Sequence, residues 1–188
     1  RRAARRSMSD LTAPPFQPRW LDAAGRRIRY VQQGDGGDAV VMVHGFGGRL
    51  ESWSSNQCVL ADGRTAIALD LPGHGESSLD VGSGSLDELA TVVLAVLDAL
   101  GIERAHLVGH SMGAALSLVL ADRVPQRVRS LTMVGPAGTG QKINAEFIRG
   151  YIGARKGVES ETLMRLLYAD PRHVTEQMLQ QAIEYKRR

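Results

Sequence analysis

A serine between two glycines is the first residue of this chain that could do chemistry. Gly109, Ser111 and Gly113 fit the pattern Gly-X-Ser-X-Gly, inside the stretch HLVGHSMGAAL. Between a strand and a helix this pattern is typical of a sharp turn that lifts the serine hydroxyl out of a sheet. Side chains at the glycine positions would collide with neighbouring backbone. We interpret Ser111 as a candidate nucleophile and the Met112 N–H as an oxyanion donor, the alternative being a glycine-rich turn that happens to carry a hydroxyl.

A second glycine-rich stretch, HGFGG at residues 44–48, follows an apolar run. The flexible backbone at Gly45 would let the Phe46 N–H point into the same pocket as a second oxyanion donor. A plain turn between strand and helix is the alternative. We expect His44 to order this loop rather than exchange protons, and His44 and His110 to line the pocket.

A third stretch, DLPGHGES at residues 70–77, follows another apolar run. Its proline and alternating glycines indicate a compact turn over the strand ends. Asp70 and His74 have side chains of the types found in catalytic triads, but both precede Ser111. We expect both to be structural or pocket-lining.

Alternating strands and helices must position these three stretches. One segment with alternating polarity and four apolar runs predict strands: 26–34, 39–43, 65–70, 105–109 and 130–135. Helical segments separate them, which implies a parallel α/β sheet with sites at the carboxyl ends of the strands.

The helices carry their own boundary signals. Ser85 precedes Glu88 by three residues, a capping box, and Gly101 can close the same helix. The next helix is expected over 111–123. Helices expected at 143–154, 159–168 and 173–186 with no further buried strand predict a helical cap or lid.

The three stretches, in this order and each after a strand, resemble the α/β-hydrolase fold superfamily. The resemblance covers roughly Ile28 to Val134. It implies a mostly parallel, doubly wound sheet with a helical cap, a serine nucleophile, an oxyanion hole, and an acid and a histidine that follow the serine along the chain.

The histidine and the acid of that family are not evident in these 188 residues. Only His173 follows Ser111, and a surface or capping role is expected for it; Asp170 and Glu176 also lie in the cap. In the family the two residues follow two later strands, which would need about 60 further residues. We therefore expect the final strands to be missing, the sequence to be incomplete at its C-terminus, and the chain to be inactive alone.

A narrower resemblance includes the cap. The stretches GRTAIALDLPGHGESS, LDALGIERAHLVGHSMG, GPAGTGQKIN and LLYADPRHVTEQML together resemble the hydrolase-fold domain of the dihydrolipoyllysine acetyltransferase component of acetoin dehydrogenase complexes. The resemblance implies other subunits of a 2-oxo-acid-type dehydrogenase complex as partners. Members of that group carry a lipoyl domain before a linker; none is present here, and we expect no cofactor.

Composition excludes several other classes of function. The net charge of +3 depends on four arginines, Arg1, Arg2, Arg5 and Arg6, so the rest of the chain carries −1 and no nucleic-acid partner is expected. No apolar run is long enough for a membrane span. The single cysteine, Cys58, is compatible with the cytoplasm, and no cluster of Cys and His has metal-ligand spacing. We expect residues 1–22 to form a basic tail or linker, 23–136 the hydrolase core and 137–188 the cap.

Three hypotheses of function remain. The first is serine acyl transfer or ester hydrolysis on a small acyl or ester substrate, with water or a thiol as acceptor. The second is a free-standing capped esterase or a hydrolase of carbon–carbon bonds. The third is a non-catalytic scaffold whose hydrolase fold mediates assembly.

Overall fold

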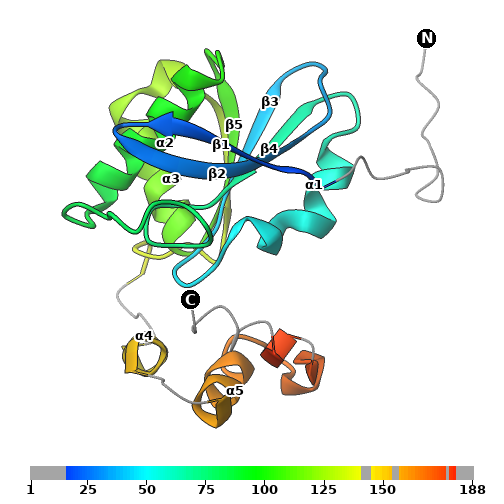
Figure 1. Cartoon of the computed structure of the whole chain (residues 1–188), viewed down its shortest axis with the longest axis vertical. Helices are drawn as coiled ribbons and strands as arrows, with labels where there is room; N and C mark the ends of the chain where they lie inside the picture. The colour runs from blue at the N-terminus through cyan, green and yellow to red at the C-terminus, as the bar shows by residue number, and fades with distance from the viewer. Residues whose placement is uncertain (1–15, 141–144, 154–156, 177, 181–188) are drawn as a thin grey trace. The chain divides into compact units, whose positions relative to one another are not determined.

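The computed structural model describes residues 16–140, 145–153, 157–176 and 178–180. They fall into two compact units that divide between Thr139 and Gly140. The first unit holds the sheet and all three glycine-rich stretches, and the second is helical (Figure 1).

Six strands form one sheet in the first unit, in the order β1-β2-β4-β3-β5-β6. Their bounds are β1 Pro18–Ala23, β2 Arg26–Gln33, β3 Ala39–Val43, β4 Thr65–Leu69, β5 Ala105–His110 and β6 Val128–Val134. The last four strands along the chain, β3 to β6, run parallel to one another, whereas β1 and β2 pair antiparallel with each other and β2 pairs antiparallel with β4. The predicted fold class is thereby confirmed.

Both faces of the central strands are buried, because side chains alternate along each strand. Val41, Val43 and Leu107 belong to the larger core, which packs against α2 (Leu86–Ala99) and α3 (Met112–Arg123). Met42 faces the other way into a smaller core with Trp53, near the short helices η2 (Leu50–Trp53) and α1 (Ser54–Leu60). Figure 1 shows α2 and α3 side by side and α1 well away from them. This double burial explains why the central strands read as continuous apolar runs.

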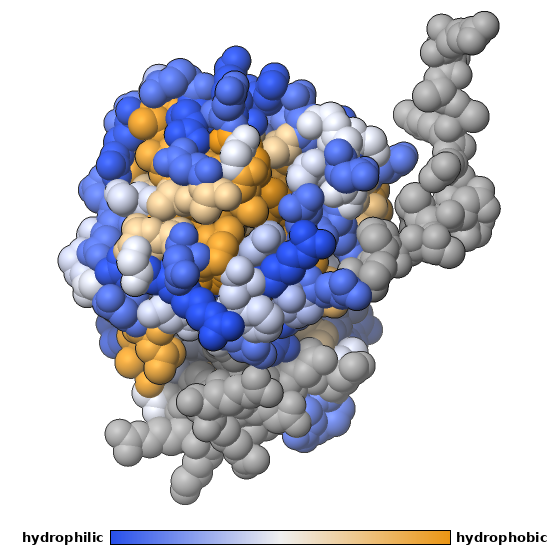
Figure 2. Space-filling view, turned by 45° about the horizontal axis from the view of Figure 1, so that its top comes forward, coloured by the Kyte–Doolittle hydropathy of each residue, from blue (hydrophilic) through white to orange (hydrophobic). Residues whose placement is uncertain are grey.

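The surface of the first unit mixes polar and apolar groups. Figure 2 shows apolar patches interrupted by polar residues on the face in view. The most exposed large apolar side chain among the described residues is that of Leu79, at 83%. Leu79 lies in the connection between β4 and α2, the segment that contains the DLPGHGES stretch.

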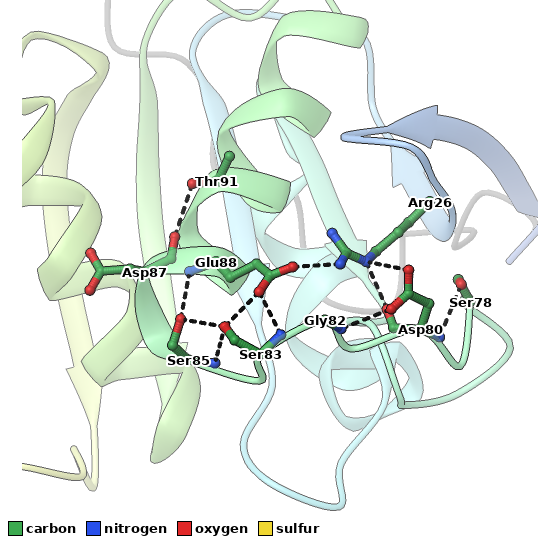
Figure 3. Close-up of polar contacts among 9 residues, drawn as sticks. All are labelled: Arg26, Ser78, Asp80, Gly82, Ser83, Ser85, Asp87, Glu88 and Thr91. Atoms are coloured by element: carbon green, nitrogen blue, oxygen red, sulfur yellow. Dashed lines mark hydrogen bonds and ion pairs between the residues drawn. The ribbon is translucent and has the colours of Figure 1, made fainter.

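A polar network fixes the start of α2 (Figure 3). The Ser85 hydroxyl accepts a hydrogen bond from the Glu88 N–H at 3.2 Å, as half of the predicted capping box requires. The other half differs: the Glu88 carboxylate accepts from the Ser83 N–H at 2.7 Å and from the Arg26 guanidinium at 2.5 Å. The Ser83 hydroxyl also donates to this carboxylate, at 2.6 Å. The bonds from the Ser83 hydroxyl, the Ser83 N–H and Arg26 lower the pKa of Glu88 to about 2. At the other end of α2, Gly101 takes the predicted left-handed conformation with φ 67°.

Several boundaries differ from the sequence analysis. The expected tail over 1–22 overlaps β1, which begins at Pro18 and pairs with β2 through six residue pairs, so the sheet starts earlier than predicted. The sequence analysis missed β1 because this segment begins with proline and contains no continuous apolar run. An edge strand tolerates proline and needs no such run. β6 begins at Val128, two residues before the predicted start.

The described part of the second unit contains the helices α4 (Ala145–Gly153) and α5 (Gly157–Arg165), the short helix η4 (Pro171–His173), and helical residues at 176 and 178–180. Gly150 allows α4 to approach α5 closely, since a Cβ there would lie 2.5 Å from a Leu163 methyl carbon. Much of the predicted helix at 173–186 lies outside the described residues. The role of this unit as a cap stays a prediction. Within the part of the chain that the structure describes, no helix has the length and apolar character needed to cross a membrane.

Candidate active site

Ser111 stands at a strained turn between β5 and α3. Its φ is 52° and its ψ −115°, a region that residues other than glycine rarely adopt. The turn is held by β6 and the loop after it: the Ser111 N–H donates to the Val134 carbonyl at 3.0 Å, and the Ser111 carbonyl accepts from the Ala137 N–H at 3.2 Å. Strain of this kind costs about 1–3 kcal/mol and persists only where surrounding structure enforces it. The structure thus forms the sharp strand-to-helix turn that the sequence predicts.

The two glycines of the turn lie against backbone. A Cβ at Gly109 would come within 2.5 Å of the Ala114 Cα, and a Cβ at Gly113 would overlap the carbonyl oxygens of Val43 and His44. The steric reason predicted for glycine at both positions is therefore present in the geometry. The close approach at Gly113 also brings the end of β3 against the start of α3.

We expect Gly113→Ala to lower the free energy of unfolding by about 1–3 kcal/mol, because the added methyl group must displace backbone rather than a mobile side chain. Urea denaturation followed by circular dichroism measures the change. Gly140→Ala is the matched control, since a Cβ at Gly140 meets nothing within 4 Å. Equal midpoints for the two variants would contradict the close approach.

The HGFGG loop lies directly beside the turn. A Cβ at Gly45 would be 3.0 Å from both the Ser111 Cβ and the His110 Nδ1. Phe46 is the next residue, and its ring meets the His74 ring edge-on at 6.0 Å between centroids. Met112 opens α3, where the first N–H groups of a helix lack intrahelical acceptors. The structure therefore brings the loop with Phe46 and the turn with Met112 together around Ser111.

His44 is fixed rather than available for proton exchange. Its ring is 1% exposed, its Nε2 accepts from the Leu71 N–H at 3.1 Å, and its Nδ1 lies 2.8 Å from the Gly45 carbonyl. Acceptance at Nε2 places the proton on Nδ1, which donates to that carbonyl. Burial lowers the pKa of His44 to about 3, so the ring is neutral. His110 is exposed on the turn, and partial desolvation lowers its pKa.

Asp70 is a fully buried structural carboxylate. It accepts from the Leu50 N–H at 2.7 Å and the Glu76 N–H at 2.9 Å, and the Arg29 guanidinium lies 3.3 Å away. Gly75, with φ 56°, passes so close that any Cβ would overlap the carboxylate. Asp70 thus joins β2, the start of η2 and the DLPGHGES loop, as the sequence analysis expects for a structural residue.

Arg29 is the residue that sequence reasoning missed. It is 6% exposed, and besides Asp70 it contacts the Glu51 carboxylate at 2.9 Å and the Glu76 carboxylate at 3.9 Å. An arginine in a strand of alternating polarity suggests a solvent-facing position, so its pattern gives no warning of burial.

The histidine and the two acids of the expected cap lie in the second unit. His173 and Glu176 are exposed there, and Asp170 caps η4 by accepting from the Arg172 N–H at 2.9 Å. Contact with Arg172 lowers the pKa of Asp170. Among the described residues, no group of three or more His, Cys, Asp or Glu side chains could hold a metal ion.

The class of protein follows from three features: the strained turn at Ser111 after β5, the glycines that pack on backbone, and the mostly parallel sheet. The model of the alpha/beta hydrolase fold family matches residues 38–178, and the chain belongs to this family. It is 47% identical over 171 residues to the dihydrolipoyllysine-residue acetyltransferase component of the acetoin cleaving system of Pseudomonas putida, which covers 90% of this chain and 46% of that protein. It is 37% identical over 155 residues to the 2-hydroxy-6-oxononadienedioate/2-hydroxy-6-oxononatrienedioate hydrolase of Burkholderia vietnamiensis, covering 80% of this chain and 51% of that one.

A solved structure agrees with the fold. The meta-cleavage product hydrolase of Pseudomonas fluorescens IP01 superposes with a TM-score of 0.83 at 26% identity, over 90% of this chain and 64% of that protein. The chain spans about half the length of the curated relatives it matches.

Proposed function

We propose that this chain carries the nucleophile and the oxyanion hole of a serine acyl-transfer site, with Ser111 as the nucleophile. The observation that carries the proposal is the positive φ of Ser111, held on a turn against which Gly45 packs. In this arrangement the N–H groups of Phe46 and Met112 would hold the oxygen of a tetrahedral intermediate. In such a site a histidine takes the serine proton and an acid orients that histidine.

We further propose that the chain belongs to the hydrolase-like part of an acetyltransferase component of an acetoin-cleaving complex. Support comes from the 47% identity to the Pseudomonas putida protein over 90% of the chain. Other subunits of such a complex would be its partners, a small acyl or ester compound its substrate, and the cytoplasm its location. Water as acceptor gives hydrolysis, and a thiol gives acyl transfer.

The test is the reaction of p-nitrophenyl acetate with the 188-residue chain over a range of alkaline pH. Hydroxide can take the serine proton without help from a histidine, so acetyl transfer to Ser111 should rise with pH. The oxyanion donors should make it on the order of 100-fold faster than transfer to an ordinary exposed serine. Mass spectrometry of peptides after an acid quench measures acetyl-Ser111.

The control variants are Ser111→Ala, which should abolish the signal at this peptide, and Ser55→Ala, an exposed serine on α1, which should leave it unchanged. Acetylation of Ser111 no faster than that of Ser55 at every pH would overturn the proposal and would favour a scaffold without catalysis.

A hydrolase of carbon–carbon bonds is the second candidate. It is supported by 37% identity to the Burkholderia vietnamiensis hydrolase and by the TM-score of 0.83 to the meta-cleavage product hydrolase. The test measures cleavage of a 2-hydroxy-6-oxo-dienoate through the loss of its ultraviolet absorbance. Cleavage that is lost in Ser111→Ala, together with slow reaction of ester substrates, would favour this candidate.

A further inference from the structure

A second serine lies beside a histidine and a carboxylate, away from Ser111. Ser130 on β6 and His106 on β5 are register partners, and the Ser130 Oγ lies 2.7 Å from the His106 Nδ1. On the other side of the ring, the His106 Nε2 lies 3.6 Å from an oxygen of Asp38, the residue before β3. The three side chains come from three neighbouring positions across the sheet and form an ordered row of Ser, His and Asp.

This row lies toward the amino ends of the strands, opposite to the turn that holds Ser111. Ser111 follows His106 by five positions, which is about 16 Å along an extended strand. Ser130 is exposed, and the side chains of His106 and Asp38 are 32% and 48% exposed. A reagent in solution can therefore reach Ser130 without entering the site at the other end of the sheet.

The Asp38 carboxylate selects which ring nitrogen of His106 carries the proton. A negative charge near Nε2 favours the tautomer with the proton on that nitrogen, which leaves Nδ1 to accept the Ser130 hydroxyl proton. Arg129 contacts the second oxygen of Asp38 at 3.0 Å, which fixes the carboxylate while its first oxygen faces His106. When His106 takes the serine proton, Asp38 stabilises the imidazolium that forms.

We propose that Ser130 is an acyl-accepting site, activated by His106 and Asp38, for activated acyl compounds such as aryl esters and thioesters. The Ser130 Oγ attacks the acyl carbonyl while its proton moves to the His106 Nδ1. The bond to the leaving aryloxide or thiolate breaks, and the leaving group then takes the proton from His106. The products are an O-acyl Ser130 and a free phenol or thiol.

The reaction at Ser130 is a modification rather than turnover. Ser130 lies within β6 rather than at a glycine turn or a helix start, so the tetrahedral intermediate at Ser130 gains little stabilisation from fixed donors. Aryloxides and thiolates are good leaving groups, so acylation of Ser130 can proceed without that stabilisation. Hydrolysis of acyl-Ser130 must instead expel the serine oxygen, which is a poorer leaving group. We therefore expect one acyl group per chain and slow hydrolysis of the ester.

The experiment treats the Ser111→Ala chain with p-nitrophenyl acetate at neutral pH. It records the release of p-nitrophenolate and locates the acetyl group by mass spectrometry. We expect a burst of about one equivalent with the label on Ser130, at a rate about 100-fold above that of an exposed serine without a histidine, the size that general-base assistance typically contributes. The Ser111→Ala background makes the result independent of the function proposed for Ser111.

The control variants separate activation from simple exposure. Adding Ser130→Ala should abolish the burst, His106→Gln should lower its rate to that of an ordinary serine, and Asp38→Asn should lower it partly. Adding Ser55→Ala should change nothing. Acetyl groups on lysines or the amino terminus alone, or labelling of Ser130 that is unchanged by His106→Gln in a chain with unchanged circular dichroism, would overturn the proposal.

Discussion

Replacing Asp70 by alanine is expected to lower the free energy of unfolding by about 3–5 kcal/mol, the loss typical when one partner of a buried ion pair is removed. The carboxylate is 0% exposed and joins three segments through Leu50, Glu76 and Arg29. Without it, two backbone N–H groups lose their acceptor and a buried guanidinium loses one of its carboxylates. Urea denaturation measures the change.

The pKa shifts of this cluster indicate which partner depends on which. Burial raises the pKa of Asp70 despite the bonds from Glu76, Leu50 and Arg29. Burial also acts to lower the pKa of Arg29, but three carboxylates together raise it. The charge of Arg29 is thus stabilised by several carboxylates. The charge of Asp70 is stabilised by one shared cation and by the two backbone N–H groups.

Two variants complete the test of Asp70. Asp70→Asn should cost less than Asp70→Ala, because an amide oxygen can still accept from one N–H. Asp62→Ala, at an exposed position, should change the unfolding free energy by about 0.5 kcal/mol or less. If Asp70→Ala unfolded at the same urea concentration as Asp62→Ala, the buried junction described for Asp70 would be refuted.

Sequence predicts the central elements because their physics is local. The predicted run at 39–43 coincides with β3, and the predicted strand at 105–109 is β5 extended by His110. The turn at Ser111 is likewise encoded locally, since glycines two residues to each side are needed wherever the backbone approaches this closely. Pairing of the HGFGG loop with that turn follows from the parallel order of the strands.

Sequence does not predict contacts between distant polar residues. Arg29 meets Asp70 across 41 positions, and Arg26 meets Glu88 across 62. No periodicity records such pairs, because each residue alone is typical of an exposed strand or helix. The same reason hides the row of Ser130, His106 and Asp38, whose members lie on three segments and come together only through the sheet register.

Acid is expected to destabilise the first unit through His44. The ring is neutral in the folded chain, with a pKa of about 3 against 6.5 for the unfolded chain. Between these values the unfolded state binds one more proton, so stability falls as pH falls. The contribution is complete above pH 6.5 and declines by about 1.4 kcal/mol for each pH unit, down to pH of about 3.

Other groups titrate in the same range and must be subtracted. Glu88, with its lowered pKa, also loses stabilising contacts as pH falls, whereas the raised pKa of Asp70 acts in the opposite direction. His44→Gln removes only the histidine, since the glutamine oxygen can accept from the Leu71 N–H in place of Nε2. The difference between the two unfolding curves isolates His44.

The variant should be less stable than the parent at pH 7, and the difference should shrink by about 2–3 kcal/mol as the pH falls to 4. Urea denaturation at half-unit steps of pH measures it. Parallel curves would mean that His44 is protonated equally in both states. That result is incompatible with a ring that accepts the Leu71 N–H at one nitrogen and donates to the Gly45 carbonyl at the other. The loop beside Ser111 therefore depends on a histidine that holds no charge, which is why a histidine in this position can order the site without exchanging protons in it.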